Sequence, residues 1–98
     1  MPRNRNKETV RELYEAILTL ESVEECEQFF QDLCSSNERS AFEQRFKVAD
    51  LLMQNTVYLD IMEKTNASTA TISRVNRVLN DGTGCMPKII ERLHEKQK

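Results

Sequence analysis

The stretch of sequence that decides the fold is TVYLDIMEKTNASTATISRVNRVL, residues 56–79. It contains no glycine or proline, and its apolar residues recur at the three- and four-residue spacing of amphipathic helices. Thr65-Asn66-Ala67 interrupts that pattern, so we expect two short helices, from Thr56 to about Lys64 and from Ser68 to about Leu79. A connection this short suits two helices that cross at a steep angle. The spacing is that of a helix-turn-helix.

The residue types within this stretch match the needs of a helix-turn-helix that reads DNA. Such a motif needs apolar residues on both helices, a turn residue that tolerates a left-handed backbone, and a hydroxyl cap on the second helix. Asn66 is predicted at the turn, because asparagine is the next-best choice after glycine there. Ser68 or Thr69 is predicted to cap. The inward-facing residues are expected to be Leu59, Ile61, Met62, Ile72, Val75 and Leu79.

The outward face of the second helix is predicted to carry small hydroxyl groups at its leading end and guanidinium groups behind them. Such a face fits the major groove of DNA. The ordinary alternative is a helical hairpin whose polar face is only solvated. The residues expected to contact DNA from this segment are Lys64, Thr69, Ala70, Thr71, Ser73, Arg74 and Arg77.

Three further helices are predicted before this segment. The apolar row from Val10 to Leu18 indicates a first helix, with Asn6 as a plausible cap. The segments 22–25 and 35–38 both have the Ser-x-x-Glu form of a capping box, in which hydroxyl and carboxylate each satisfy a free backbone N–H. They predict a second helix to about Cys34 and a third, the longest, from Glu38 to about Gln54.

One more helix is predicted after the segment. Gly82 and Gly84 end the fifth helix, and Pro87 falls in the first turn of a sixth. We expect Ile89, Ile90 and Leu93 on the inner face of that helix. The last residues, 95–98, are expected to fray.

Length and composition favour one small all-α domain. The chain has 98 residues, of which 39% are hydrophobic and 31% charged, and its 2 Gly and 2 Pro leave little turn chemistry for hairpins. We predict a single helical domain over residues 8–98, preceded by a flexible basic arm over residues 1–7. Arg3, Arg5 and Lys7 of this arm are added to the expected DNA contacts.

Several classes of protein are excluded by what the sequence lacks. No apolar run approaches the roughly 20 residues that span a bilayer, and the start MPRNRNK has no signal-like stretch, so a cytoplasmic protein without membrane contact is expected. The spacing of Cys26, Cys34 and Cys85 is neither that of a zinc site nor a disulfide framework. His94 is interpreted as a helix-end side chain. With no catalytic motif, we expect neither an enzyme nor a cofactor or metal.

The third helix is apolar over much of its circumference. Phe42, Phe46, Ala49 and Met53 form one stripe, and the segment 48–52 adds Val48, Leu51 and Leu52 to it. A helix of this kind is usually enclosed, and a small chain has few other helices to enclose it. The pattern predicts a homodimer, although the remaining helices of the same chain could also wrap the third.

Two blocks of the sequence resemble matching blocks of the bacterial tryptophan repressor family. They are ERSAFEQR at residues 38–45 and ATISR at residues 70–74. The similarity runs from about residue 8 to 94, and the chain as a whole resembles the YerC/YecD-type branch. The resemblance implies a six-helix fold and an intertwined dimer, in which helices one, two, three and six of both chains share a core. Helices four and five would project as two heads that read double-stranded DNA.

The resemblance also implies where a corepressor would bind. In the family an arginine on each side holds the indole of L-tryptophan, and the matching positions are Arg45 and Arg74. A glycine that gives the ring room is replaced by Val75, and a serine that helps bind the amino group by Val78. Overpacking a slot costs on the order of 1–3 kcal/mol, and losing a polar partner costs a similar amount. L-tryptophan is therefore not expected to be the effector.

The sequence thus predicts a dimeric, sequence-specific DNA-binding regulator of transcription, most simply a repressor that blocks promoter access. The alternative is a helical protein–protein interaction module that uses the helix-turn-helix as a docking surface. The net charge of −2 and the scarcity of lysine in residues 56–79 favour this alternative.

Overall fold

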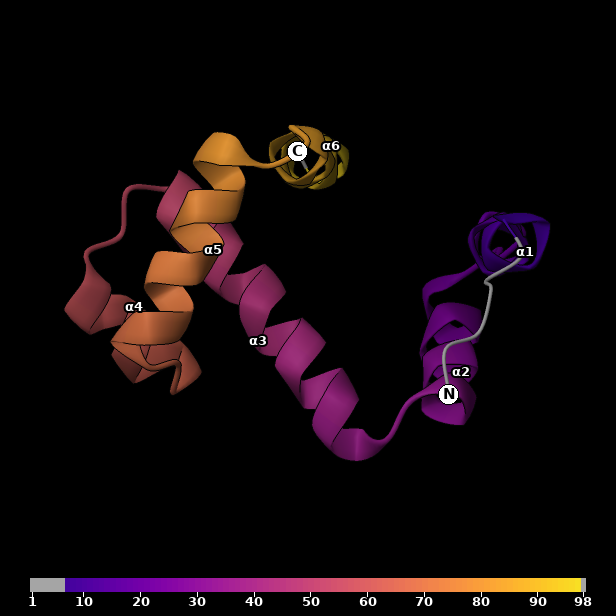
Figure 1. The fold of residues 1–98 in the computed structure, drawn as a ribbon. Helices are drawn as coiled ribbons and strands as arrows, with labels where there is room; N and C mark the ends of the chain where they lie inside the picture. Colours follow the sequence, from indigo (N-terminus) through magenta and orange to yellow (C-terminus); the bar gives the residue numbers. More distant parts are fainter. Residues whose placement is uncertain (1–6, 98) are drawn as a thin grey trace. The chain divides into compact units, whose positions relative to one another are not determined.

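The structure, a computed structural model, describes residues 7–97, and these residues form six α-helices and no strand (Figure 1). The expected all-α fold with six helices is confirmed. No helix in the described range is long and apolar enough to cross a membrane. The helices are α1 (Lys7–Ile17), α2 (Val23–Leu33), α3 (Ser36–Met53), α4 (Tyr58–Thr65), α5 (Thr69–Asp81) and α6 (Cys85–Lys96).

The chain divides after Arg39 into two compact units. The first unit contains α1, α2 and the first turn of α3. The second contains the rest of α3 together with α4, α5 and α6. Most of the predicted DNA-contacting residues belong to the second unit.

Both capping boxes of the first unit form. The Ser22 hydroxyl accepts a hydrogen bond from the Glu25 N–H at 3.0 Å, and the Glu25 carboxylate accepts one from the Glu21 N–H at 2.9 Å. At α3, the Ser35 hydroxyl accepts from the Glu38 N–H at 3.2 Å and the Glu38 carboxylate accepts from the Ser35 N–H at 2.8 Å. The bonds from Ser35 favour the charged carboxylate and lower the pKa of Glu38. Helix α3 therefore begins at Ser36, before the predicted Glu38.

The helices of the first unit have no buried residue in the single chain. Leu18, the last residue of the predicted apolar row, lies just after α1 and is 85% exposed, and Val23 of α2 is 71% exposed. Cys26 and Cys34 are half-buried. An apolar stripe of this size is normally covered in a folded protein.

The second unit has a compact core, to which α3, α4, α5 and α6 all contribute. Helix α5 packs against both α4 and α6. Burial of each large aliphatic side chain contributes about 1.5–3 kcal/mol. The core residues are Val48, Ala49, Leu51, Ile61, Ala67, Ile72, Val75 and Ile90.

Two residues predicted to face inward do not. Leu59 is 74% exposed and Ile89 is 40% exposed in the single chain. Successive helical residues are rotated by about 100°, so Ile61 and Ile90, which are fully buried, turn these neighbours outward. Leu79, Leu93 and Met62 are half-buried at the margin of the core.

The glycines between α5 and α6 have different roles. A Cβ at Gly82 would lie 2.4 Å from the Val78 carbonyl oxygen, so the chain can approach the end of α5 only without a side chain here. Gly84 has a left-handed φ of 87° and precedes α6, which begins at Cys85 and has Pro87 in its first turn.

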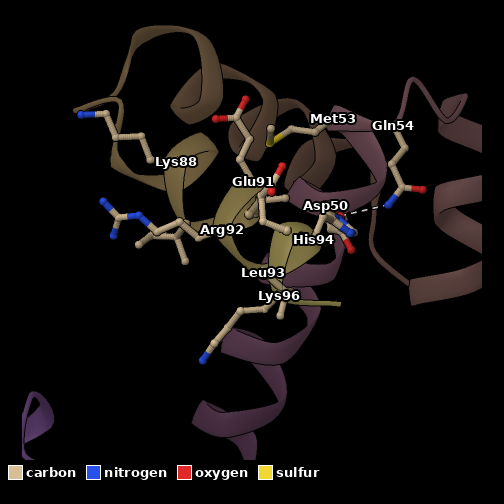
Figure 2. A pocket seen from close by; sticks show the side chains of 12 residues that line it. Asp50, Met53, Gln54, Lys88, Glu91, Arg92, Leu93, His94 and Lys96 are labelled. Atoms are coloured by element: carbon tan, nitrogen blue, oxygen red, sulfur yellow. Dashed lines mark hydrogen bonds and ion pairs between the residues drawn. The ribbon is translucent and has the colours of Figure 1, made fainter. Parts of the chain in front are cut away.

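The end of α6 is bonded to α3 at His94, just before the segment 95–98 that was predicted to fray. The Nε2 atom of His94 lies 2.6 Å from Oδ1 of Asp50, which is 6% exposed (Figure 2). Gln54 also donates to Asp50 Oδ1, at 3.0 Å, and the Lys47 ammonium lies 3.9 Å from Oδ2. His94 lies in the last turn, as predicted, but it links two helices. Helix α6 consequently extends to Lys96.

Candidate nucleic-acid interface

The connection between α4 and α5 is a left-handed turn at Asn66, as predicted. Asn66 has φ 61° and ψ 15°, and its N–H donates to the Met62 carbonyl at 2.8 Å. Asparagine is one of the few residues that adopt this backbone at low cost. The Thr65 hydroxyl donates to the Ile61 carbonyl at 2.7 Å and accepts from the Ala67 N–H at 3.1 Å. The turn is therefore bonded on both sides of Asn66.

Ser68, the first of the two predicted candidates, is the cap of α5. Its backbone is extended, and its hydroxyl oxygen accepts from the Thr71 N–H at 3.1 Å. The same hydroxyl donates to Thr71 Oγ1 at 3.2 Å. Thr69 is consequently the first helical residue, and its exposed side chain is available on the surface.

Helix α5 separates an apolar face from a polar face. Ile72 and Val75 are buried in the core. Thr69, Ser73 and Arg77 follow one another at four-residue spacing and are exposed, and Ala70 and Arg74 form a second exposed row beside them. Thr71 lies at the margin and is half-buried. The structure thus brings the six predicted α5 residues together, five of them on open surface.

The exposed face of α5 has a net positive charge. In α5, Arg74 and Arg77 are followed by a single acidic residue, Asp81, at the end of the helix. Lys64 is exposed in the last turn of α4. Within residues 7–97, the ion pairs of the chain all involve Asp50, so these three cations have no carboxylate partner there. Their charges are available to a ligand.

The predicted arm, residues 1–7, lies outside the described residues except for Lys7. Arg3 and Arg5 are therefore not described by the structure. Lys7 is the exposed first residue of α1, in the first unit.

Arg45 and Arg74, the predicted effector-binding residues, do not line a ligand-binding slot in the described part of the chain. Arg45 is exposed, and its guanidinium carbon lies 5.6 Å from the ring centroid of Phe42, one helical turn before it. Arg74 is exposed on α5. Val75 is buried within the core, where a ring slot would need space, and Val78 is exposed. Within residues 7–97, no ion pair joins Arg45 or Arg74 to a carboxylate.

A polar residue that sequence reasoning missed connects α3 with the turn. The amide Nε2 of Gln44 donates to the carbonyl of Thr65 at 3.0 Å, across 21 residues of sequence. No local motif indicates this bond, because a glutamine on a helix is most often solvated.

The comparisons with known proteins agree with this architecture. Residues 8–94 match the family described as Trp repressor protein. The chain belongs to this family of helical proteins. It is 43% identical over 86 residues to the uncharacterized protein YerC of Bacillus subtilis (strain 168), a match that covers 88% of this chain and 83% of that protein. The predicted membership, including the YerC-type branch, is confirmed.

Two solved structures share the fold. One is a TrpR like protein from Eubacterium eligens ATCC 27750, with a TM-score of 0.87 and 49% identity over 90% of this chain and 91% of that one. The other is a putative Trp repressor from Staphylococcus aureus, with a TM-score of 0.87 and 45% identity over 91% of this chain and 89% of that one.

Proposed function

We propose that this protein is a sequence-specific DNA-binding regulator of transcription. In this proposal α4, the Asn66 turn and α5 form a helix-turn-helix reading head, here defined as residues 58–81. The observation that carries the proposal is the division of α5 into a buried apolar face and an exposed face of small polar groups and arginines. The family membership of the chain supports the same conclusion.

The leading half of α5 would enter the major groove. Thr69, Ala70, Thr71 and Ser73 are small enough for the helix to approach base edges closely, and hydroxyl groups can donate to or accept from bases. Arg74 and Arg77 lie further along α5 and would bind phosphates, as would Lys64 in the last turn of α4. The arm residues Arg3, Arg5 and Lys7 would add phosphate contacts that carry no sequence information.

The regulator would act as a homodimer with an intertwined core. Support comes from the apolar side chains that the single chain leaves in water, among them Leu18, Val23 and Phe42, which is 47% exposed. Two reading heads related by a two-fold axis would bind two half-sites of an operator. Bound at a promoter, such a dimer would repress transcription by blocking access.

L-tryptophan is not the effector in this proposal. The buried Val75 leaves no room for an indole beside Arg74, and Val78 offers no hydroxyl group. DNA binding would then require no small molecule of this kind.

A docking surface for another protein is the second candidate function. The apolar side chains of Val57 and Leu59 at the start of α4, both well exposed, favour it. On this view the reading head would bind a protein through α4, and the exposed face of α5 would be solvated.

The experiment is selection of binding sites from a randomised duplex pool, followed by fluorescence anisotropy of the best duplex at several salt concentrations. Each phosphate contact contributes about 0.9 to the slope of log affinity against log salt. A DNA reader gives a selected motif and a steep negative slope. No enrichment and no salt-dependent binding would favour the docking surface.

A further inference from the structure

We propose that Gln44 is the positioning residue that fixes the reading head on α3. This inference rests on the proposed function, because it explains how the head keeps one orientation toward DNA. Gln44 does not belong to the exposed face of α5 and would not contact DNA.

The hydrogen bond from Gln44 joins α3 to the carbonyl oxygen at the end of α4. Thr65 is the last residue of α4, and its carbonyl is one of those that a helix end leaves without a partner in the helix. The half-buried Gln44 donates to this oxygen at 3.0 Å from α3. Because the donor is a neutral amide, the bond satisfies a free carbonyl without burying a charge.

The turn that receives this bond is itself stiff. The Thr65 hydroxyl bonds to Ile61 on one side and to the Ala67 N–H on the other, and Asn66 returns its N–H to Met62. Ala67 is buried, and Ser68 next to it caps α5. A restraint on Thr65 is thereby passed through two residues to the leading end of α5.

No other side-chain hydrogen bond within residues 7–97 joins α3 to the reading head. The remaining bonds of α3 side chains serve its N-terminus, or join Asp50 to Gln54 just after α3 and to His94 of α6. The other contacts between α3 and the head are apolar, through residues such as Ala49, Ile61 and Ile72. Apolar contacts are non-directional, whereas a hydrogen bond fixes direction as well as distance. The apolar contacts therefore keep the reading head close to α3, whereas the hydrogen bond from Gln44 fixes its orientation.

The affinity for DNA depends on the fraction of molecules in which the reading head has the orientation that fits DNA. A neutral hydrogen bond changes an equilibrium constant by about two- to tenfold. Without the bond the head would spend more time in orientations that do not fit DNA, and the apparent affinity falls with the competent fraction. The loss is expected to be equal for all DNA sequences, because no base or phosphate contact is removed.

The test compares Gln44→Met with Gln54→Met. Methionine is close to glutamine in size and lacks the donor. The control removes a bond of the same kind, from Gln54 to Asp50, which does not reach the head. Amide hydrogen exchange of residues 66–71 and of α6 is measured, together with affinity for the selected duplex and its salt dependence.

We expect Gln44→Met to speed exchange in residues 66–71 and to weaken binding by about two- to tenfold per head, with the salt slope, site preference and exchange of α6 unchanged. Gln54→Met should leave residues 66–71 and binding as they are. Binding and exchange of Gln44→Met equal to those of the unmodified protein would overturn the proposal, and so would faster exchange throughout the second unit in both variants.

A second variant covers the case in which Gln44→Met does not fold. Gln44→Glu keeps the length of the side chain but places an acceptor against the Thr65 carbonyl, and it is judged by the same measurements. If the unmodified protein binds no duplex, the proposed function fails, whereas hydrogen exchange still decides whether Gln44 restrains the turn.

Discussion

Replacement of Asp50 by asparagine should destabilise the protein at neutral pH, and this loss should disappear in acid. The buried Asp50 accepts through Oδ1 from the half-buried His94 Nε2 at 2.6 Å and from the exposed Gln54 Nε2 at 3.0 Å (Figure 2). An ionised carboxylate only accepts hydrogen bonds, so His94 must carry its proton on Nε2. Asp50→Asn keeps the shape of the side chain and removes its charge.

The magnitude follows from these contacts. A hydrogen bond to a charged group contributes about 1.5–3 kcal/mol, whereas the contact with the exposed Lys47 adds less than about 1 kcal/mol. We expect Asp50→Asn to lower the free energy of unfolding by about 2 kcal/mol at pH 7. For a chain of this length that corresponds to a fall in Tm of roughly 10 °C.

The pH dependence has a definite sign. Burial alone would raise the pKa of Asp50, but the hydrogen bonds from His94 and Gln54 and the charges of His94 and Lys47 outweigh it, so the pKa lies below its ordinary value of 3.8. A lowered pKa in the folded state means that ionised Asp50 stabilises the fold above pH 3.8, and that this contribution is lost as the pH falls through the lower folded value.

The assay is urea unfolding followed by circular dichroism between pH 2.5 and about 8, at one protein concentration because a dimer's stability depends on it. Asp32→Asn, at an exposed position of α2, controls for the loss of one negative charge. The gap between the unmodified protein and Asp50→Asn should be full at pH 5–8 and should shrink below about pH 4. A variant as stable as the unmodified protein at pH 7, or a gap that persists in acid, would refute the reasoning.

Three further predictions concern assembly and binding. Sedimentation at micromolar concentration should show a dimer, and a compact 11.4 kDa species with full helix content would contradict the intertwined core. Arg77→Ala should weaken binding to all duplexes alike and reduce the slope of log affinity against log salt by roughly 1. Thr71→Ala should instead change the preference between sites in a randomised pool. If Thr71→Ala weakened binding equally at every site, Thr71 would not belong to the reading face. Millimolar L-tryptophan should produce no heat in calorimetry and no change in DNA affinity, and saturable binding that tightens the DNA complex would show that Val75 and Val78 do not block the slot.

Helix boundaries were predicted well where a local motif determines them. The Ser22 and Ser35 boxes and the Asn66 turn each depend on a few neighbouring residues, so the sequence is sufficient to place them. The start of α4 was placed too early, at Thr56, because that residue completes the end of α3. Its N–H donates to the Leu51 carbonyl at 3.0 Å, after a left-handed residue at Asn55.

The exposed face of α5 was predicted from periodicity, because the buried Ile72 and Val75 fix the orientation of every other residue on that helix. Periodicity was less informative at Leu59 and Ile89. An apolar residue at the edge of the buried face of a helix is enclosed or exposed depending on which other segment packs against it. A single sequence does not show which segment that is.

The polar contacts of α3 were out of reach of the sequence for a different reason. Gln44 bonds to a residue 21 positions away, and Asp50 to one 44 positions away. Neither belongs to a spacing motif, and each resembles a solvated side chain until the fold brings its partner close.

Helix α3 therefore makes two side-chain hydrogen bonds to other parts of the second unit, and they restrain different elements. Gln44 holds the reading head, and Asp50 holds α6. The two residues are six positions apart, which is about 9 Å along a helix axis, and they share no partner. Effects of changes at such a separation usually add. The double variant Gln44→Met with Asp50→Asn should consequently show the stability loss of the second change and the binding loss of the first. A coupling well above about 0.5 kcal/mol would mean that α6 and the reading head respond to each other through α3.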